Sequence, residues 1–171
     1  VLDTTPQYIK LVAGEKQTVV FSDKHKSGLI IKKYDEGTGK PLPNAEFSVA
    51  IKDGSIIWAG MTNAKGQIFL DNLNVNDEWL TITEIAPPPN YIIVDKSKDV
   101  YIKAGEVVEV KFDNREKPKL QIIKIDQDGN PLAGAVIKVE KTEDKTVSTY
   151  VTDETGTIFI DGLDEAVYSI K

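Results

Sequence analysis

Two stretches of the chain read V-V-F-S-D-K-H-K-S-G-L-I-I-K-K-Y-D (Val19 to Asp35) and V-K-F-D-N-R-E-K-P-K-L-Q-I-I-K-I-D (Val110 to Asp126), and they align without a gap. Lys33 and Lys124 occupy equivalent positions in this alignment, 91 residues apart. A second matching pair, T-N-A-K-G-Q-I-F-L-D-N-L and T-D-E-T-G-T-I-F-I-D-G-L, follows at an offset of 90 residues. Repeats of this length are whole domains rather than solenoid units, so the sequence predicts a tandem array.

The repeat predicts one complete domain over residues 26–117. Residues 1–25 match the closing strands of a preceding domain, and residues 118–171 match the opening part of a following one. We therefore expect the chain to be a piece of a longer array. Because the two partial copies are complementary, we also expect residues 118–171 of one molecule to be completed by residues 1–25 of another, giving head-to-tail chains. The alternative is that both ends are frayed in solution.

The composition limits the classes of function. The chain has 171 residues, a net charge of −6, 40% hydrophobic residues and no cysteine. Its mixed, acidic charge argues against nucleic acid as a partner, because phosphate binding needs a basic stripe. No apolar run reaches membrane-spanning length, and the absence of cysteine excludes disulfides and thiolate metal sites. We expect no cofactor and no metal, and we interpret D-Q-D-G-N (Asp126 to Asn130) as a turn rather than a calcium loop.

The local pattern is β throughout. Short alternating stretches rich in β-branched and aromatic residues, such as L-I-I-K-K-Y and W-L-T-I-T-E, are separated by turns that contain Gly, Pro and Asn. No stretch keeps helical periodicity for three turns. Short strands at regular spacing predict a β-sandwich. The junctions between copies are only a few residues long, so neighbouring domains are expected to be held stiffly.

Strand parity points to three polar side chains inside the complete domain. Side chains two residues apart in a strand share a face. Three strands each carry an apolar face that ends in one polar group: Lys33 after residues 29 and 31, Glu84 after 80 and 82, and Asn114 after 110 and 112. A buried lone Lys or Glu is costly unless it is paired, so the three groups are expected to meet if the three faces form one core.

Such a constellation has a natural chemistry. Burial favours a neutral amine and a protonated carboxylic acid. A neutral Lys33 amine held against the Asn114 carboxamide could attack it and expel ammonia, while Glu84 polarises the carboxamide oxygen and shuttles protons. The alternative is a salt bridge between Lys33 and Glu84 at the rim, with Asn114 bonded to a turn, because strand ends often emerge into solvent. Parity alone leaves both readings open.

Four motifs follow one another along the chain: K-Y-D from Lys33, K-P-L-P-N-A-E-F from Lys40, E-I-A-P-P-P-N-Y from Glu84 and F-D-N from Phe112. Together with the partial copies, this set resembles the B-type repeats of the collagen adhesin and the similar domains of Gram-positive pilins and surface adhesins. The resemblance covers essentially all residues, in one full copy and two partial copies.

This resemblance implies tandem β-sandwiches of the prealbumin-like, inverse-immunoglobulin type. It also implies an isopeptide bond between Lys33 and Asn114, with Glu84 as the catalyst. The chain departs from the family pattern at Pro87, where alanine is usual, and at Asn90, where glycine is usual. The second change is mild because Asn tolerates the left-handed conformation of a turn.

The partial copies offer a second, incomplete set of partners. Lys124 matches Lys33 and Asp23 matches Asn114, and the resemblance allows aspartate as an acceptor. The glutamate that would match Glu84 falls one position beyond the sequence, so no complete second triad exists in it. Lys32 has the opposite parity to Lys33 and is predicted to face solvent.

Repetition, stiff junctions and the resemblance together predict a structural stalk module of an extracellular, cell-wall-anchored adhesin or pilin. Its expected partners are the neighbouring repeats of the same chain, and host matrix is expected to bind through other domains. One alternative is a ligand-binding domain for a host matrix protein or glycan, which an exposed aromatic patch would support. Another is an accessory sandwich of a secreted enzyme, although no Ser/His/Asp set or metal cluster supports catalysis on an external substrate. We interpret the aromatic residues Trp58, Phe69 and Trp79 as internal packing.

Overall fold

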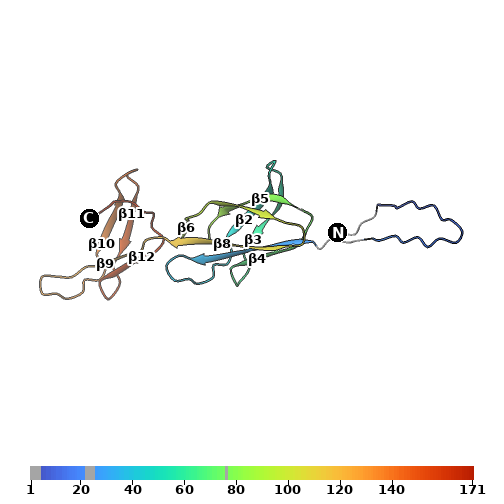
Figure 1. Ribbon diagram of the computed structural model, residues 1–171. Coiled ribbons are helices and arrows are strands. Elements are labelled where there is room, and N and C mark those ends of the chain that lie inside the picture. Colours follow the sequence, from blue (N-terminus) through green and yellow to red (C-terminus); the bar gives the residue numbers. More distant parts are fainter. Residues whose placement is uncertain (1–4, 22–25, 76) are drawn as a thin grey trace. The chain divides into compact units, whose positions relative to one another are not determined.

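The computed structural model describes residues 5–21, 26–75 and 77–171, and every regular element in this part of the chain is a β-strand (Figure 1). The predicted all-β class is therefore confirmed. Within the described residues, no helix is long and apolar enough to cross a membrane. The chain divides into two compact units: the first contains the described residues up to Pro88 and residues 93–113, and the second contains residues 89–92 and 114–171.

Two four-stranded sheets contain the strands of the first unit. One sheet has the strand order β4 (Gln67–Leu73), β1 (Ser27–Asp35), β8 (Val107–Glu116) and β6 (Tyr91–Ile93). The other has the order β3 (Ile56–Met61), β2 (Glu46–Ile51), β5 (Glu78–Ala86) and β7 (Ser97–Ile102). Strands β6 and β8 extend across the boundary between the units.

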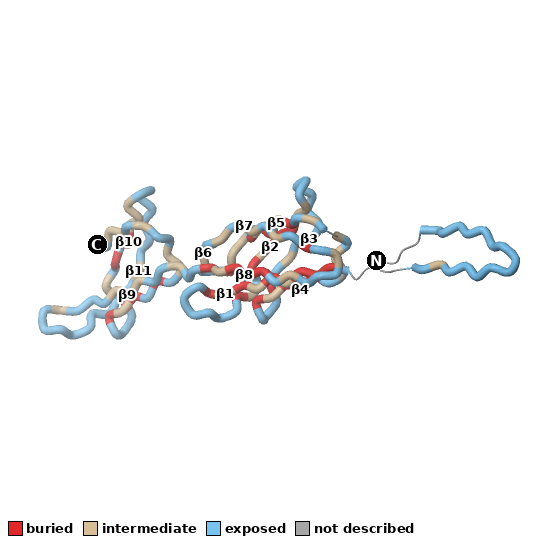
Figure 2. Tube along the Cα trace, in the orientation of Figure 1, coloured by how far each residue is buried: buried red, intermediate tan, exposed pale blue. Residues whose placement is uncertain are grey.

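Alternating residues of both sheets build the core of the first unit, where Figure 2 shows red segments on β1, β2, β5 and β8. The Phe47 ring of β2 meets the Phe112 ring of β8 edge to face, with 5.0 Å between ring centroids. The other fully buried apolar residues are Leu29, Ile31, Ala45, Val49, Leu80, Ile82 and Ile102. A core shared by two sheets is the sandwich that the strand pattern predicts.

A glycine turn fixes the backbone of β1 at Lys33. The Lys33 amide donates to the Gly66 carbonyl at 2.8 Å, and the Lys33 carbonyl accepts from the Leu42 amide at 2.9 Å. Gly66 has a φ of 66°, and a Cβ placed there would lie 2.6 Å from the Lys33 carbonyl oxygen. Only glycine fits this position, since it needs both the left-handed conformation and the close approach.

The second unit has a three-stranded sheet and a two-stranded sheet. The larger has the order β11 (Val147–Val151), β10 (Val136–Lys141) and β13 (Tyr168–Ile170), and the smaller pairs β12 (Thr157–Ile160) with β9 (Leu120–Ile123). Its small core contains the buried side chains of Ile137, Val139, Ile158 and Ile160.

The second unit repeats the backbone frame of the first. The Lys124 amide donates to the Gly156 carbonyl at 2.8 Å, and the Lys124 carbonyl accepts from Leu132 at 2.9 Å. The Thr152 hydroxyl donates to the Leu132 carbonyl and accepts from the Ala135 amide. In the first unit, the Thr62 hydroxyl makes the equivalent hydrogen bonds with Leu42 and Ala45. D-Q-D-G-N forms a turn in which Asp126 accepts backbone hydrogen bonds, and no cluster of metal-ligating side chains occurs among the described residues.

Residues 5–21 contain no strand, although the Gln7 side-chain amide donates to the Val20 carbonyl at 3.1 Å. Most of their apolar side chains, among them Tyr8 and Phe21, are exposed. The prediction that this segment supplies the closing strands of another copy stays a prediction. Asp23 lies outside the described residues.

One expectation about the aromatic residues is wrong. Trp58 packs against the core as expected. Phe69 and Trp79, in contrast, are 57% and 50% exposed. Phe69 lies opposite Ile30, and Trp79 lies opposite Tyr101. Phe69 lies between the buried residues Ile68 and Leu70, and Trp79 precedes the buried Leu80. Strand alternation therefore turns both aromatic side chains to the outer faces of their sheets.

We predict that Gly66→Ala destabilises the first unit by more than Gly54→Ala. Both glycines have positive φ, but a Cβ at Gly54 meets no atom within 4 Å, whereas one at Gly66 meets backbone. Strain alone costs roughly 1 kcal/mol, and the clash adds to it at Gly66. Urea unfolding of the two variants measures the difference, and equal losses would contradict the proposed constraint.

Candidate functional site

A fully buried lysine–glutamate pair lies inside the first unit. The Lys33 Nζ of β1 donates to the Glu84 Oε2 of β5 at 2.8 Å, and both side chains are 0% exposed. The two residues come from opposite sheets of the sandwich. Their complete burial excludes the alternative of a salt bridge at the solvent-exposed rim.

Backbone contacts hold both members of the pair. The Gly66 turn and Leu42 fix Lys33, as described above. Glu84 lies opposite Phe47 in the register of β5 and β2, and its amide donates to the Lys96 carbonyl at 2.8 Å. These hydrogen bonds fix the backbone at both residues, so the two side chains are already held in place before any reaction.

Aromatic rings surround the amine. The Lys33 Nζ lies 6.0 Å from the centroid of the Phe47 ring and 5.9 Å from that of Phe112. Both rings are fully buried. They make the surroundings of the amine apolar, so electrostatic interactions there are stronger than in water.

Adjacent lysines in β1 respond to these surroundings in opposite ways. Burial lowers the pKa of the Lys33 amine below its ordinary value of 10.5, and the hydrogen bond and charge of Glu84 oppose that change. Lys32 instead forms an ion pair with Glu109 that raises the pKa of Lys32. Its side chain is partly exposed on the opposite face of β1, as strand parity predicts.

Asn114 is fully buried on β8. It follows Phe112 by two residues, so the alternation of β8 gives both the same face. Its role as the acceptor of a bond stays a prediction, as does the role of Glu84 as the catalyst.

The corresponding lysine of the second unit has different surroundings. Lys124 is exposed, and its Nζ donates a long hydrogen bond of 3.3 Å to the neighbouring Ile125 carbonyl. Because Asp23 lies outside the described residues, the second pair of cross-link partners stays a prediction.

Sequence reasoning missed one residue near the pair. The Lys98 Nζ lies 5.1 Å from the centroid of the Phe112 ring, donates to the Lys111 carbonyl at 2.8 Å and pairs with Asp95 at 3.0 Å. The sequence contains a signal for this residue: Lys98 shares a strand face with Val100 and Ile102, so it is the polar group at the end of another apolar face.

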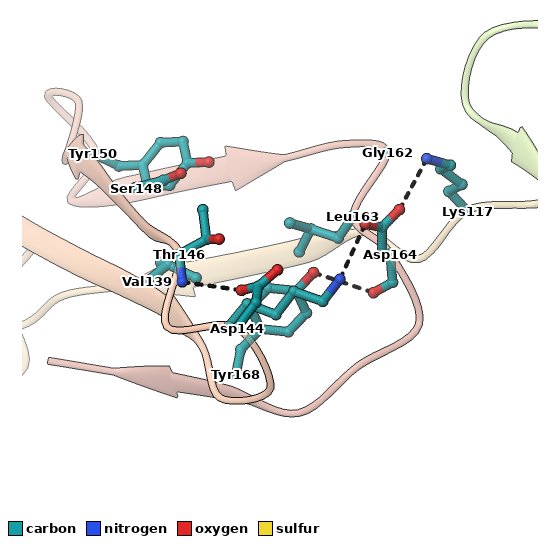
Figure 3. Close-up of a pocket in the computed structure, with 11 residues that line it drawn as sticks. Lys117, Val139, Asp144, Thr146, Ser148, Tyr150, Gly162, Leu163, Asp164 and Tyr168 are labelled. Atoms are coloured by element: carbon teal, nitrogen blue, oxygen red, sulfur yellow. Dashed lines mark hydrogen bonds and ion pairs between the residues drawn. The ribbon is translucent and has the colours of Figure 1, made fainter.

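The second unit contains a cavity of about 360 Å³ (Figure 3). Asp164 accepts there from Lys117 at 3.0 Å and from Lys141 at 3.3 Å, and these contacts lower the pKa of the Asp164 carboxyl. Asp164 is 58% exposed and the two lysines are partly exposed, so these groups lack the complete burial that gives Lys33 its altered chemistry.

The first unit and the second both match one family. A family model described as SpaA, prealbumin-like fold domain, matches residues 27–116 and again residues 118–171. A comparison with curated protein sequences gives no match.

Solved structures share the fold. The Bacillus anthracis TIE protein is 27% identical over 86% of this chain and 28% of its own, with a TM-score of 0.50. The Streptococcal ancillary pilin is 18% identical over 86% of this chain and 53% of its own, with a TM-score of 0.52. The shaft pilin SpaA from Lactobacillus rhamnosus GG is 14% identical over 86% of each chain, with a TM-score of 0.56. The chain thus spans about a quarter of the first protein and about half of the second.

We predict that the lowered pKa of Lys33 makes stability depend on pH in Asn114→Ala, where the amine cannot be consumed. Above its folded-state pKa the buried amine is neutral, while the unfolded amine still binds a proton up to about 10.5. The unfolded state then binds more protons, so the free energy of unfolding rises with pH in that window and is flat below it.

The measurement is urea unfolding from neutral pH to about pH 10.5, comparing Asn114→Ala with Asn114→Ala/Lys33→Met. Lys32→Met in the same background is the control: because the pKa of Lys32 is raised above 10.5, its contribution is lost only at higher pH and should stay constant over this range. A Lys33 contribution that falls with pH would contradict the assignment.

Proposed function

Because the chain belongs to the family of SpaA prealbumin-like fold domains, we propose that it is a structural stalk module of a Gram-positive surface adhesin or pilin, reinforced by an isopeptide bond between Lys33 and Asn114. The observation that carries the proposal is the fully buried hydrogen bond between Lys33 and Glu84. A buried pair of this kind is poor evidence for stability alone, so a chemical role is the better explanation.

The reaction joins two side chains of the domain that the repeat predicts over residues 26–117. The neutral Lys33 amine attacks the Asn114 carboxamide carbon, and a new C–N bond forms as the old C–N bond breaks. One amine proton passes through the Glu84 carboxyl to the leaving nitrogen, which departs as ammonia. Glu84 ends in the state in which it began, and the domain reacts once.

Three features support Asn114 as the acceptor. Strand β8 lies next to β1 in the sheet. Phe112 of β8 is within cation–π range of the Lys33 amine, and Asn114 shares the Phe112 face. Asn114 is also fully buried, so its carboxamide lies in an interior that excludes competing water.

The apolar surroundings favour the reactive state of the amine. A protonated ammonium has no lone pair and cannot attack, and the lowered pKa of Lys33 increases the neutral fraction. The 2.8 Å contact gives Glu84 direct access to the proton that must leave. Fixed placement supplies the effective concentration that a free amine and amide lack in water.

We further propose that the module is extracellular, belongs to a cell-wall-anchored protein and has the neighbouring repeats of its own chain as partners. Pilins are among the solved structures with this fold, and they support that setting. The cross-linking is self-directed, so the proposal includes no turnover of an external substrate. Host matrix contact is assigned to other parts of the full protein.

The outer face of one sheet favours a second candidate function, ligand binding. Trp79 and Tyr101 are 50% and 40% exposed, and their rings meet edge to face with centroids 5.4 Å apart. Beside them the Thr81 hydroxyl donates to Asp99 at 2.7 Å. Exposed Trp and Tyr are favoured at binding surfaces, so binding of a host glycan or matrix protein that Trp79→Ala abolishes would favour this function.

We predict that the denatured, intact protein weighs one ammonia less than its sequence. Glu84→Ala should restore the full mass, because it removes the proton shuttle. Glu109→Ala is the matched control, since Glu109 also pairs with a β1 lysine but on the exposed face. Full mass in the unaltered protein, or ammonia loss that persists in Glu84→Ala, would contradict the mechanism.

We also predict that the bond raises thermodynamic stability. It would close a loop of about 80 residues, for which the chain-entropy model of cross-links gives roughly 4 to 5 kcal/mol, less any strain. Asn114→Ala and Lys33→Met remove the bond by different routes, and both should lose stability of this order in denaturant unfolding. Unchanged unfolding midpoints in both variants would show that the cross-link is thermodynamically silent or absent.

A further inference from the structure

A second lysine reaches the aromatic ring that covers the candidate site. Lys98 of β7 lies opposite Ile82 of β5, and Ile82 is fully buried. Residues opposite each other in antiparallel strands face the same side, so the Lys98 side chain points towards the interior. It is 36% exposed, which means that most of its surface is covered.

The Lys98 ammonium joins the two sheets at their open edge. Strand β7 is the last strand of one sheet, and β8 belongs to the other. From β7, the Lys98 Nζ donates to the Lys111 carbonyl of β8 at 2.8 Å, and it lies 5.1 Å from the centroid of the Phe112 ring. The Lys33 Nζ lies 5.9 Å from the centroid of the same ring. The side-chain nitrogens of both lysines therefore approach the Phe112 ring.

The segment that carries Lys98 is attached at several points. The Lys96 carbonyl accepts from the Glu84 amide at 2.8 Å. Asp95 pairs with the Lys98 ammonium at 3.0 Å. One short segment, residues 95–98, thus contacts the backbone of the candidate catalyst and, through Lys98, the strand that carries the candidate acceptor.

We propose that Lys98 is a positioning residue, a strap between the two sheets that holds Phe112 over the Lys33 amine and keeps water from the Lys33–Glu84 pair. Its effect on bond formation rests on the proposed function, whereas its shielding of Lys33 does not. Excluding water keeps the amine neutral and strengthens its contact with Glu84. An inward charge on an edge strand can also serve only to prevent edge-to-edge association, and this simpler role predicts no effect on Lys33.

Three variants isolate the strap. Lys98→Met keeps the apolar stem but removes the charge and the donor, and Lys98→Arg restores both. Lys96→Met is the matched control, because Lys96 is an exposed lysine of the same segment that contacts Glu84 only through its backbone. If Lys98→Met does not fold, Asp95→Asn is used instead, because it removes the ion pair between Asp95 and the Lys98 ammonium.

The first readout is the rate of ammonia loss after refolding from denaturant, followed by intact mass. Lys98→Met should react about tenfold more slowly or worse, because small displacements of reacting groups cost rates of that order. Lys98→Arg should recover most of the rate, and Lys96→Met should match the unaltered protein.

The second readout does not depend on the bond. In an Asn114→Ala background, acetic anhydride labels accessible neutral amines, and peptide masses report the labelling of Lys33. Lys98→Met should raise that labelling about tenfold, as expected for an amine released from a water-excluded site, and Lys98→Arg should not. If Lys98→Met raises the labelling of Lys33 but the unaltered protein loses no ammonia, the proposed function is refuted and the role of Lys98 is retained. Unchanged labelling of Lys33 in Lys98→Met overturns the strap.

Discussion

The hydrogen bond between Lys33 and Glu84 is the interaction on which the rest of the first unit depends. Two ionisable groups without solvent exposure must share a proton or a charge, and an apolar pair of similar volume is often as stable or more stable. The fully buried rings of Phe47 and Phe112 lie about 6 Å from the amine and make its surroundings apolar, which increases this cost. The fold therefore maintains a state that stability does not explain, and a reaction that consumes the amine would relieve it.

The frame that presents the lysine is local, whereas its burial depends on distant strands. In both units a glycine turn and a leucine amide hold the lysine backbone by the same two hydrogen bonds, at Lys33 and at Lys124. Lys33 is nevertheless fully buried, and Lys124 is exposed. The difference arises from β5 and β8, which bring Glu84 and Phe112 to Lys33 from far along the chain. Short motifs thus place the backbone, and the reactivity of the side chain requires the whole sandwich.

The same division explains what sequence could predict. Alternation along single strands predicted the inward Lys33, Glu84 and Asn114 and the outward Lys32, because parity is a local property. Phe69 and Trp79 were misjudged, although parity turns both to the outer faces of their sheets, Trp79 beside Tyr101. Lys98 was missed for a related reason, since its importance comes from the Phe112 ring and the Lys111 carbonyl of a strand in the other sheet. Parity along β7 indicates that Lys98 points inward, but the ring and the carbonyl that it reaches belong to a strand of the other sheet.

The direction of the strands explains why the proposed bond would suit the proposed stalk. The Gly28 amide donates to the Glu106 carbonyl, so β1 and β8, which are neighbours in one sheet, start at the same end and run in parallel. A chain pulled through the domain enters at the start of β1 and leaves at the end of β8, which loads the hydrogen bonds between these strands in shear. With the proposed bond, the covalent path runs from β1 through Lys33 directly to Asn114, and residues 34–113 carry no load. The remainder of the sandwich would then serve chiefly to form the bond and to protect it.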